Sequence, residues 1–109
     1  MTLLLTTQSY RKDVATPFGL LLEMDTGDGR ILRQLRINTP VKSALPGERL
    51  KPGLRGLSSY QGKLYVCTWT RVYVVDPDTF EVTGELSHQW MSDLHGIHVN
   101  QDGIWVTSS

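Results

Sequence analysis

The sequence lacks most of the features that would place a chain in a class at once. It has a single cysteine among 109 residues, so no internal disulfide can form, and acidic and basic residues balance at eleven each. No apolar run is long enough to cross a membrane. The start, "MTLLLTTQSYRK", has no basic segment before its leucines, which argues against a signal peptide. A cytoplasmic, reduced setting is therefore the expectation.

Motifs that would carry a known chemistry are also missing. "GDGRIL" lacks the third glycine and the helix of a dinucleotide fingerprint, and "DPDT" lacks the glycine and distal glutamate of a calcium loop. Few aromatics interleave with the basic residues, and no nucleic-acid module is recognisable. No segment combines a helical period with caps. We therefore expect neither nucleic acid nor membrane as a partner, and no helical fold.

Short apolar runs separated by turn residues are what the sequence does contain. "KLYVC" and "RVYVVD" are rich in β-branched and aromatic residues, "DPDT" is a strong turn signal, and "FEVTGEL" alternates. With "RGLSSY" before them, they predict four short antiparallel strands, with an inner first strand, two buried strands and an amphipathic outer one. We expect Cys67 to be a small buried hydrophobe rather than a reactive thiol, and Val66 to be covered on both sides.

The pattern repeats along the chain. "HGIHVNQDGIWVTSS", at the end, matches "RGLSSYQGKLYVCTW" forty residues earlier, with identities at Gly56/Gly96, Gln61/Gln101 and Val66/Val106. Before them, "TLLLTTQ", "GLLLEMD", "TGDG" and "RILRQLRI" repeat the second strand, the third strand, the turn and the fourth strand. The sequence thus predicts an incomplete unit over 1–37, a complete unit over 54–87 and the start of a third over 94–109.

Four-stranded meanders of this length are typical of β-propeller blades. The predicted fold is therefore all-β, a partial β-propeller of four-stranded antiparallel blades in one domain over 1–109. "LHGIHVNQDGIWVTSS" and "VYVVDPDTFEVTGEL" also resemble the six-bladed propellers of the NHL-repeat and virginiamycin B lyase-like groups. The resemblance implies that further blades complete a ring. Either a longer chain supplies them, this one being an N-terminal fragment of about two and a quarter blades, or several copies associate.

Alternate connections of a meander lie at opposite ends of its strands, and here the longer ones share one end. Loops above a rigid scaffold usually carry function, so this end is the predicted binding face. The charges sort in the same way and make this face positive, which favours an anionic ligand. Its basic residues are Arg11, Lys12, Arg36, Lys42, Arg49, Lys51, Arg55 and Arg71, against Asp13, Glu48 and Asp93. The turn end is assigned Glu23, Asp25, Asp28, Asp76, Asp78, Glu81, Glu85 and Asp102.

Arg55 and His95 are the main candidates for ligand contact. They occupy equivalent places at the start of the first strand of successive units, and that strand lines the channel of a propeller. A histidine there could act as a general base or a metal ligand, and the alternative is a hydrogen bond that joins neighbouring blades. Arg71, Trp69 and His88 complete the candidate set from nearby loops.

Three functions are compatible with this pattern. The first is a small-ligand binder or enzyme at the channel mouth; the propellers that the chain resembles include lyases, lactonases and hydrolases, many of which hold a metal ion there. The resemblance thus implies a divalent metal in the complete propeller, although no metal-ligand set is assigned within this chain. The second is a non-catalytic interaction platform for a protein or a polyanion. The third is a structural segment without a complete site.

Overall fold

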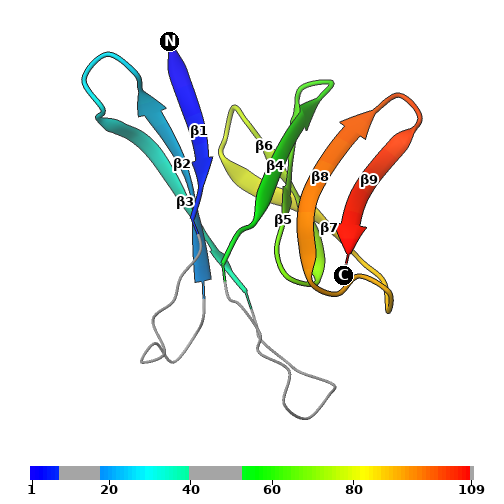
Figure 1. Cartoon of the computed structure of the whole chain (residues 1–109). Helices are drawn as coiled ribbons and strands as arrows, with labels where there is room; N and C mark the ends of the chain where they lie inside the picture. The colour runs from blue at the N-terminus through cyan, green and yellow to red at the C-terminus, as the bar shows by residue number, and fades with distance from the viewer. Residues whose placement is uncertain (8–17, 40–52, 109) are drawn as a thin grey trace.

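The computed structural model describes residues 1–7, 18–39 and 53–108 (Figure 1). These residues form nine strands in three antiparallel sheets, with the orders β1-β2-β3, β4-β5-β6-β7 and β8-β9. The prediction of an all-β fold is confirmed. The sheets stand side by side in an open row (Figure 1). The strands are β1 (Thr2–Thr6), β2 (Phe18–Asp25), β3 (Ile31–Asn38), β4 (Gly56–Tyr60), β5 (Lys63–Cys67), β6 (Arg71–Asp76), β7 (Glu81–Ser87), β8 (Leu94–Asn100) and β9 (Gly103–Ser108).

One kind of turn closes the β2–β3 and β6–β7 hairpins, at the upper end of the first two sheets (Figure 1). The Oδ1 atoms of Asp25 and Asp76 each accept a hydrogen bond of 2.7 Å from the amide two residues ahead. Four residues after each aspartate, Gly29 and Phe80 have positive φ angles of 73° and 58°. Their N–H groups donate to the carbonyls of Asp25 and Asp76 at 2.9 and 2.8 Å. The aspartates thus close the turns with their own side chains, as short turns often require.

A β-bulge follows each of these turns. Leu32 in β3 and Thr83 in β7 are the extra residues, because the register shifts between Glu23 and Met24 and between Val74 and Val75. A bulge changes which residues share a side. The alternation predicted for these two strands is therefore wrong near the turns, where Ile31 is out of phase with Leu35 and Ile37, and Val82 with Gly84 and Leu86.

At the opposite end of the strands, a threonine follows β1 in the first sheet and β5 in the second, and it bonds to the start of the next strand. Thr7 Oγ1 accepts the Leu20 N–H at 2.9 Å, and the Thr7 N–H donates to the Leu20 carbonyl at 3.0 Å. Thr68 does the same with Arg71, at 3.1 and 2.8 Å. Thr7 and Thr68 therefore define equivalent positions, and residues can be matched between β1 and β5 by counting back from them.

The first hairpins of the second and third sheets share one register. The pairs run from Gly56 with Cys67 to Tyr60 with Lys63 in β4–β5, and each has a counterpart forty residues later in β8–β9. β8 differs at its start, where the register shift between Leu94 and Gly96 makes His95 a bulged residue.

Two separate apolar cores hold the sheets together. The first lies between the first and second sheets and contains Leu21, Ile37, Leu54, Leu64, Val66, Tyr73, Val75 and Phe80. The second lies between the second and third sheets and contains Cys67, Val72 and Leu94, with Tyr65, Met91, Ile97 and Val106 packed against them. The second sheet is thus covered on both faces. Val66 and Cys67 are fully buried, as predicted, whereas Val106 is only half-buried.

The second and third sheets meet at their first strands, β4 and β8. A Cβ on Gly56 would lie 3.1 Å from Cys67 Sγ in the same sheet, a tight contact, and 3.4 Å from Ile97 Cγ2 in β8, an ordinary van der Waals distance. The Val99 N–H also donates to Ser58 Oγ at 3.1 Å, from β8 to β4. These contacts place two first strands side by side, at the junction that positions the candidate site.

A matched pair of aspartate substitutions tests the first core. Val66 is 0% exposed and Val82, on β7 at the outer edge of the same sheet, is 42% exposed. Val66→Asp buries an unpaired carboxylate, so we expect a loss of more than about 4 kcal/mol and no cooperative thermal unfolding transition. Val82→Asp adds the same charge in a hydrated place and should cost less than about 1 kcal/mol. Similar melting curves for the two variants would contradict the assignment of the core.

Candidate functional site

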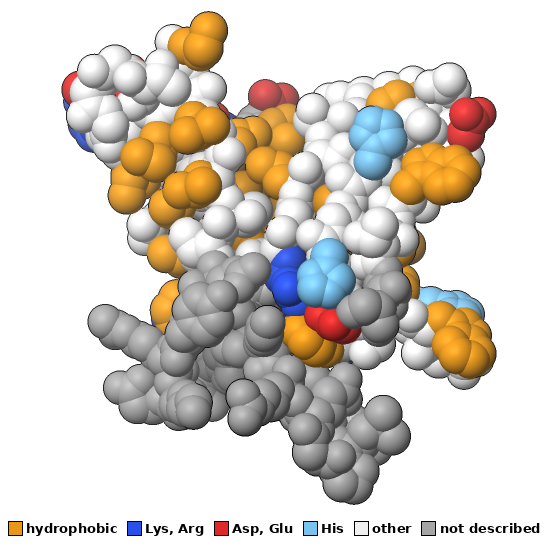
Figure 2. All heavy atoms as spheres, viewed as in Figure 1, with side chains coloured by type: hydrophobic (Ala, Val, Ile, Leu, Met, Phe, Trp, Pro, Cys, Tyr) orange, Lys and Arg blue, Asp and Glu red, His pale blue; other side chains and the backbone are white. Residues whose placement is uncertain are grey.

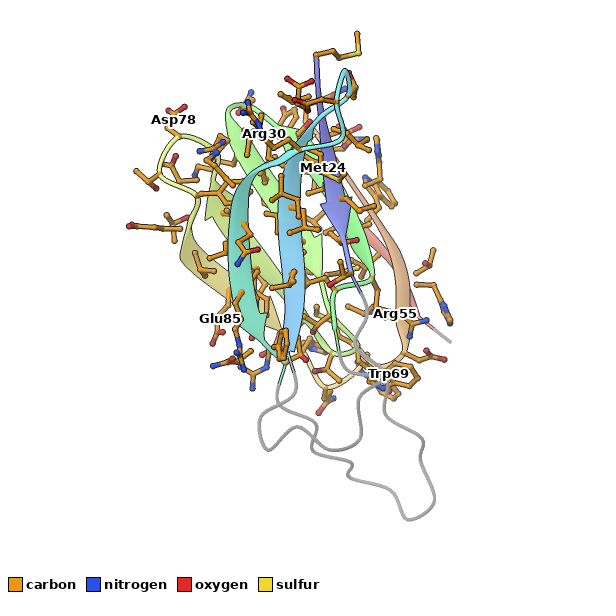
Figure 3. The ribbon with its side chains drawn as sticks, turned by 90° about the vertical axis from the view of Figure 1, so that its left-hand side faces the viewer. Met24, Arg30, Arg55, Trp69, Asp78 and Glu85 are labelled. Atoms are coloured by element: carbon orange, nitrogen blue, oxygen red, sulfur yellow. The ribbon has the colours of Figure 1, made fainter. Side chains whose placement is uncertain are left out.

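The candidate site lies at the end of the strands opposite the aspartate turns. Arg55 immediately precedes β4, Trp69 follows β5, and Asp93 and His95 flank the first residue of β8. Figure 3 shows Arg55 and Trp69 together at this end, with Asp78 and Arg30 at the other. The structure therefore brings Arg55 and His95 together, although they are forty residues apart in the sequence.

Arg55, Asp93 and His95 form one contact cluster. Arg55 Nη1 donates to Asp93 Oδ1 at 3.0 Å, and Nη2 lies 3.2 Å from His95 Nδ1. His95 Nε2 lies 3.3 Å from Asp93 Oδ2. The tautomer that carries its proton on Nε2 satisfies both histidine contacts, because Nδ1 then accepts and Nε2 donates. The cluster joins the starts of β4 and β8, and hence two neighbouring sheets.

Burial makes this ion pair stronger than an ordinary surface pair. The side chain of Arg55 is 8% exposed and that of Asp93 is 26% exposed. A guanidinium removed from water needs an opposite charge and hydrogen bonds, and Asp93 supplies the charge. The side chain of His95, at 49%, is the most accessible member. The partners of Arg55 come from the start of the next sheet, so its contacts join two neighbouring sheets.

The backbone around Asp93 places the cluster. Asp93 has a φ of 52°, a left-handed conformation that aspartate tolerates better than most residues. The next residue, Leu94, is fully buried, and its N–H donates to the Trp69 carbonyl at 3.1 Å. The bulge at His95 then turns the strand at the place where its ring meets Arg55. A buried leucine thus anchors the segment between Asp93 and His95, the two partners of Arg55.

Two buried N–H groups of the site have no acceptor. The guanidinium of Arg55 stacks over the Trp69 ring, 4.9 Å from its centroid. Arg55 Nε and Trp69 Nε1 are buried and have no hydrogen-bond partner in the described part of the chain. Buried donors are normally satisfied, and an unsatisfied one costs about 1–3 kcal/mol. These two N–H groups are hydrogen-bond donors of the site that the Arg55–Asp93 pair does not use.

Cys67 lies beside this cluster but is not a nucleophile. It is fully buried in the second core. Burial raises the pKa of its thiol, and the nearby charge of Arg55 offsets this only in part. The thiol form therefore predominates at neutral pH. Because the thiol has a higher pKa in the folded chain, its contribution to folding stability is fully present below the pKa of the unfolded thiol. This contribution is lost as the pH rises through the pKa of the folded thiol.

The other candidates have different partners. Arg71 pairs with Glu85 at 3.5 Å, and both side chains are well exposed, so the pair contributes little. His88 is exposed, and its Nδ1 accepts the Trp90 N–H at 3.2 Å. Glu85, predicted at the turn end, lies instead toward the loop end beside Arg71, far from Asp78 (Figure 3).

These pairs reduce the unpaired positive charge of the predicted binding face. Arg55 and Arg71 both have carboxylate partners, and Arg36 lies over the Phe18 ring, 3.9 Å from its centroid. The remaining charges assigned to this face lie outside the described residues: Arg11, Lys12, Asp13, Lys42, Glu48, Arg49 and Lys51. Sequence reasoning counted Asp93 only as a loop charge and missed its role. The available signal was its position two residues before His95.

A metal ion does not fit the described residues. They contain no group of three or more His, Cys, Asp or Glu side chains that could hold one. Within the same residues, no helix is long and apolar enough to span a membrane. No protein-family model matches the chain, and no curated protein matches it in sequence.

Removing the charge of Asp93 tests the cluster. Asp93→Asn keeps a residue that tolerates the left-handed backbone but leaves Arg55 buried without a counter-charge, so we expect a loss of about 2–3 kcal/mol. Cys67, buried at the same junction, should then react with a thiol reagent roughly 30-fold faster, as the third sheet opens more often. Asp102→Asn, in an exposed turn, is the control. Unchanged stability and labelling in both variants would show that the cluster does not hold the sheets.

Proposed function

We propose that the chain is a segment of a β-propeller, in which the three sheets are successive blades. The observation that supports this most is the repeated junction. The second sheet packs one face on the first sheet and the opposite face on the third, and each junction has its own apolar core. A sandwich has one core between two sheets, whereas blades each pack on two neighbours.

Matching details at equivalent positions support the same proposal. The β4–β5 and β8–β9 hairpins have one register at a spacing of forty residues, and β4 lies beside β8. The buried Leu54 and Leu94 hold equivalent places at the starts of these hairpins, forty residues apart, and their N–H groups donate to the carbonyls of Thr7 and Trp69 at 2.8 and 3.1 Å. Adjacent first strands are what a propeller requires around its channel.

In this proposal the chain acts as a rigid scaffold for binding at the end where the longer connections lie. Arg55, Asp93 and His95 fix the angle and offset between two blades there, because a guanidinium with two directional partners tolerates little sliding. Loops held on such a platform can bind another protein or a small ligand without paying a large ordering cost.

Reciprocal leucine truncations test whether the sheets pack as neighbouring blades. Leu21 and Leu94 are both 0% exposed, one in each core. Either change to alanine should cost about 2–5 kcal/mol at its own junction. By hydrogen exchange we expect Leu94→Ala to speed exchange in β8 and β9 but not in β2 and β3, and Leu21→Ala to do the reverse. Equal acceleration throughout the chain in both variants would indicate one shared core and refute the proposal.

A small anionic ligand is the second function that the geometry favours. Its support is the pair of buried donors, Arg55 Nε and Trp69 Nε1, beside the half-exposed His95. In this proposal, carboxylate or phosphate oxygens accept hydrogen bonds from these N–H groups while Asp93 stays paired with Arg55 Nη1. The charge of Arg55 would make these bonds stronger than neutral ones.

Removal of a single donor tests this second function. Phosphate, compared with chloride at equal ionic strength, should stabilise the wild-type chain by about 1.4 kcal/mol at ten times the Kd, a rise in Tm of roughly 4–8 °C. Trp69→Phe keeps the ring under Arg55 but removes the N–H, and should abolish this rise. Trp90→Phe, which changes an exposed loop tryptophan, should retain it. The same Tm rise in all three proteins, or none in the wild type, would exclude the site.

A further inference from the structure

The outward face of the first sheet is apolar and uncovered. Leu3, Leu5 and Ile31 are 49%, 42% and 50% exposed. Leu5 pairs with Leu22, and Leu3 and Ile31 both pair with Met24, so these side chains share one side of the sheet. Figure 2 shows hydrophobic side chains gathered over the β1–β3 sheet. We call this surface, defined by Leu3, Leu5, Met24 and Ile31, the leading face; Leu22 lies on the same side of the sheet but is only 8% exposed.

The second sheet shows what covers a face of this kind. Counting back from Thr7 and Thr68, Leu5 is equivalent to Val66 and Leu3 to Leu64. Val66 and Leu64 are 0% and 4% exposed, because the first sheet packs on them. The leading face therefore repeats a surface that, one sheet further on, is buried by the neighbouring sheet.

The third sheet has the complementary open surface. Trp105, which is 59% exposed, pairs with His98 on the side opposite Ile97 and Val106, the residues that pack on the second sheet. A hollow of about 330 Å³ lies there, bordered by residues that include Gly96 and Thr107. We call the surface made by Gly96, His98, Trp105 and Thr107 the trailing face.

The trailing face also has a covered equivalent in the second sheet. At the forty-residue spacing, Trp105 matches Tyr65, and His98 matches Ser58. Tyr65 packs in the second core, and Ser58 Oγ accepts the Val99 N–H from the third sheet. An aromatic residue at the same position of both hairpins, covered in one and open in the other, marks the trailing face as a surface that receives another sheet.

From these two equivalences we infer that the chain associates head to tail with a second copy of itself, the trailing face of one copy docking on the leading face of the next. This inference rests on the proposed blade packing. The two faces are the two halves of a junction that already occurs twice within the chain. None of the residues that define them is a carboxylate or a lysine, so no like-charge repulsion opposes their contact.

The geometry of this contact is heterologous, because the two surfaces differ. A heterologous contact leaves one free leading face and one free trailing face after each addition, so association continues until the assembly closes into a ring. Among the described residues, β1 and β9 are edge strands of their sheets, and their outer edges do not have to pair in such a contact. Association is by face packing, as between the sheets within the chain.

Two charged variants of the 109-residue chain separate this arrangement from others. Leu5→Arg blocks the leading face and Trp105→Arg blocks the trailing face, while Trp90→Arg makes the same tryptophan change at a residue 76% exposed in a loop. By sedimentation velocity across a concentration series, we expect the wild type and Trp90→Arg to form assemblies larger than a dimer. Each blocked variant alone should be monomeric. Mixed together, the two blocked variants should form a 1:1 heterodimer, because each keeps the face that the other lacks.

The alternative outcomes each contradict the inference. A monomeric wild type at about 100 µM would mean that a different sheet covers these faces, and a blocked variant that still assembles like the wild type would mean that its face is not used. Blocked variants that fail to pair when mixed, with wild-type circular dichroism, would indicate a symmetric contact instead. Leu3→Lys and Thr107→Lys provide a second pair if either arginine variant unfolds. The hydrogen-exchange result on the two cores does not depend on any of these outcomes, so the two proposals can fail separately.

Discussion

The middle sheet carries apolar side chains on both of its faces, and water has to be excluded from both. In β5, Leu64 and Val66 point to the first sheet, and Tyr65 and Cys67 point to the third. Strands of this kind lose their main driving force unless each face is covered. The neighbouring sheets supply that cover, and the two cores, the close first strands and the position of the candidate site all follow from it.

Two local features set how the second and third sheets meet. Gly56 of β4 lies against Ile97 and Gly96 of β8, and the preceding residue, Arg55, reaches across to Asp93 and His95. Apolar contacts alone are non-directional and would permit sliding. The buried guanidinium is stable only when its partners are in place, so it selects one offset between the sheets. Apolar burial thus provides most of the stabilisation, and the polar cluster provides the specificity.

Much of this fold could be predicted from the sequence because its signals are local. Turn residues and short β-branched runs indicate the strands, and the forty-residue spacing places Arg55 and His95 at equivalent positions of successive units, where the structure has them in contact. The bulges at Leu32 and Thr83 were missed, because a bulge depends on how many residues the facing strand offers. The partnership of Asp93 was missed for a related reason, since it links segments 38 residues apart through the packing of whole sheets.

The aspartate turns described above also bear on the order of folding. Each is closed by hydrogen bonds between residues two to four apart, so the β2–β3 and β6–β7 hairpins form with little loss of chain entropy. The ion pair between Arg55 and Asp93 closes a far longer loop and can form only after two hairpins have met. These two hairpins can therefore form first and then search for partners, since an isolated hairpin is only marginally stable in water. During that search their apolar faces are exposed to any other chain that carries the same faces.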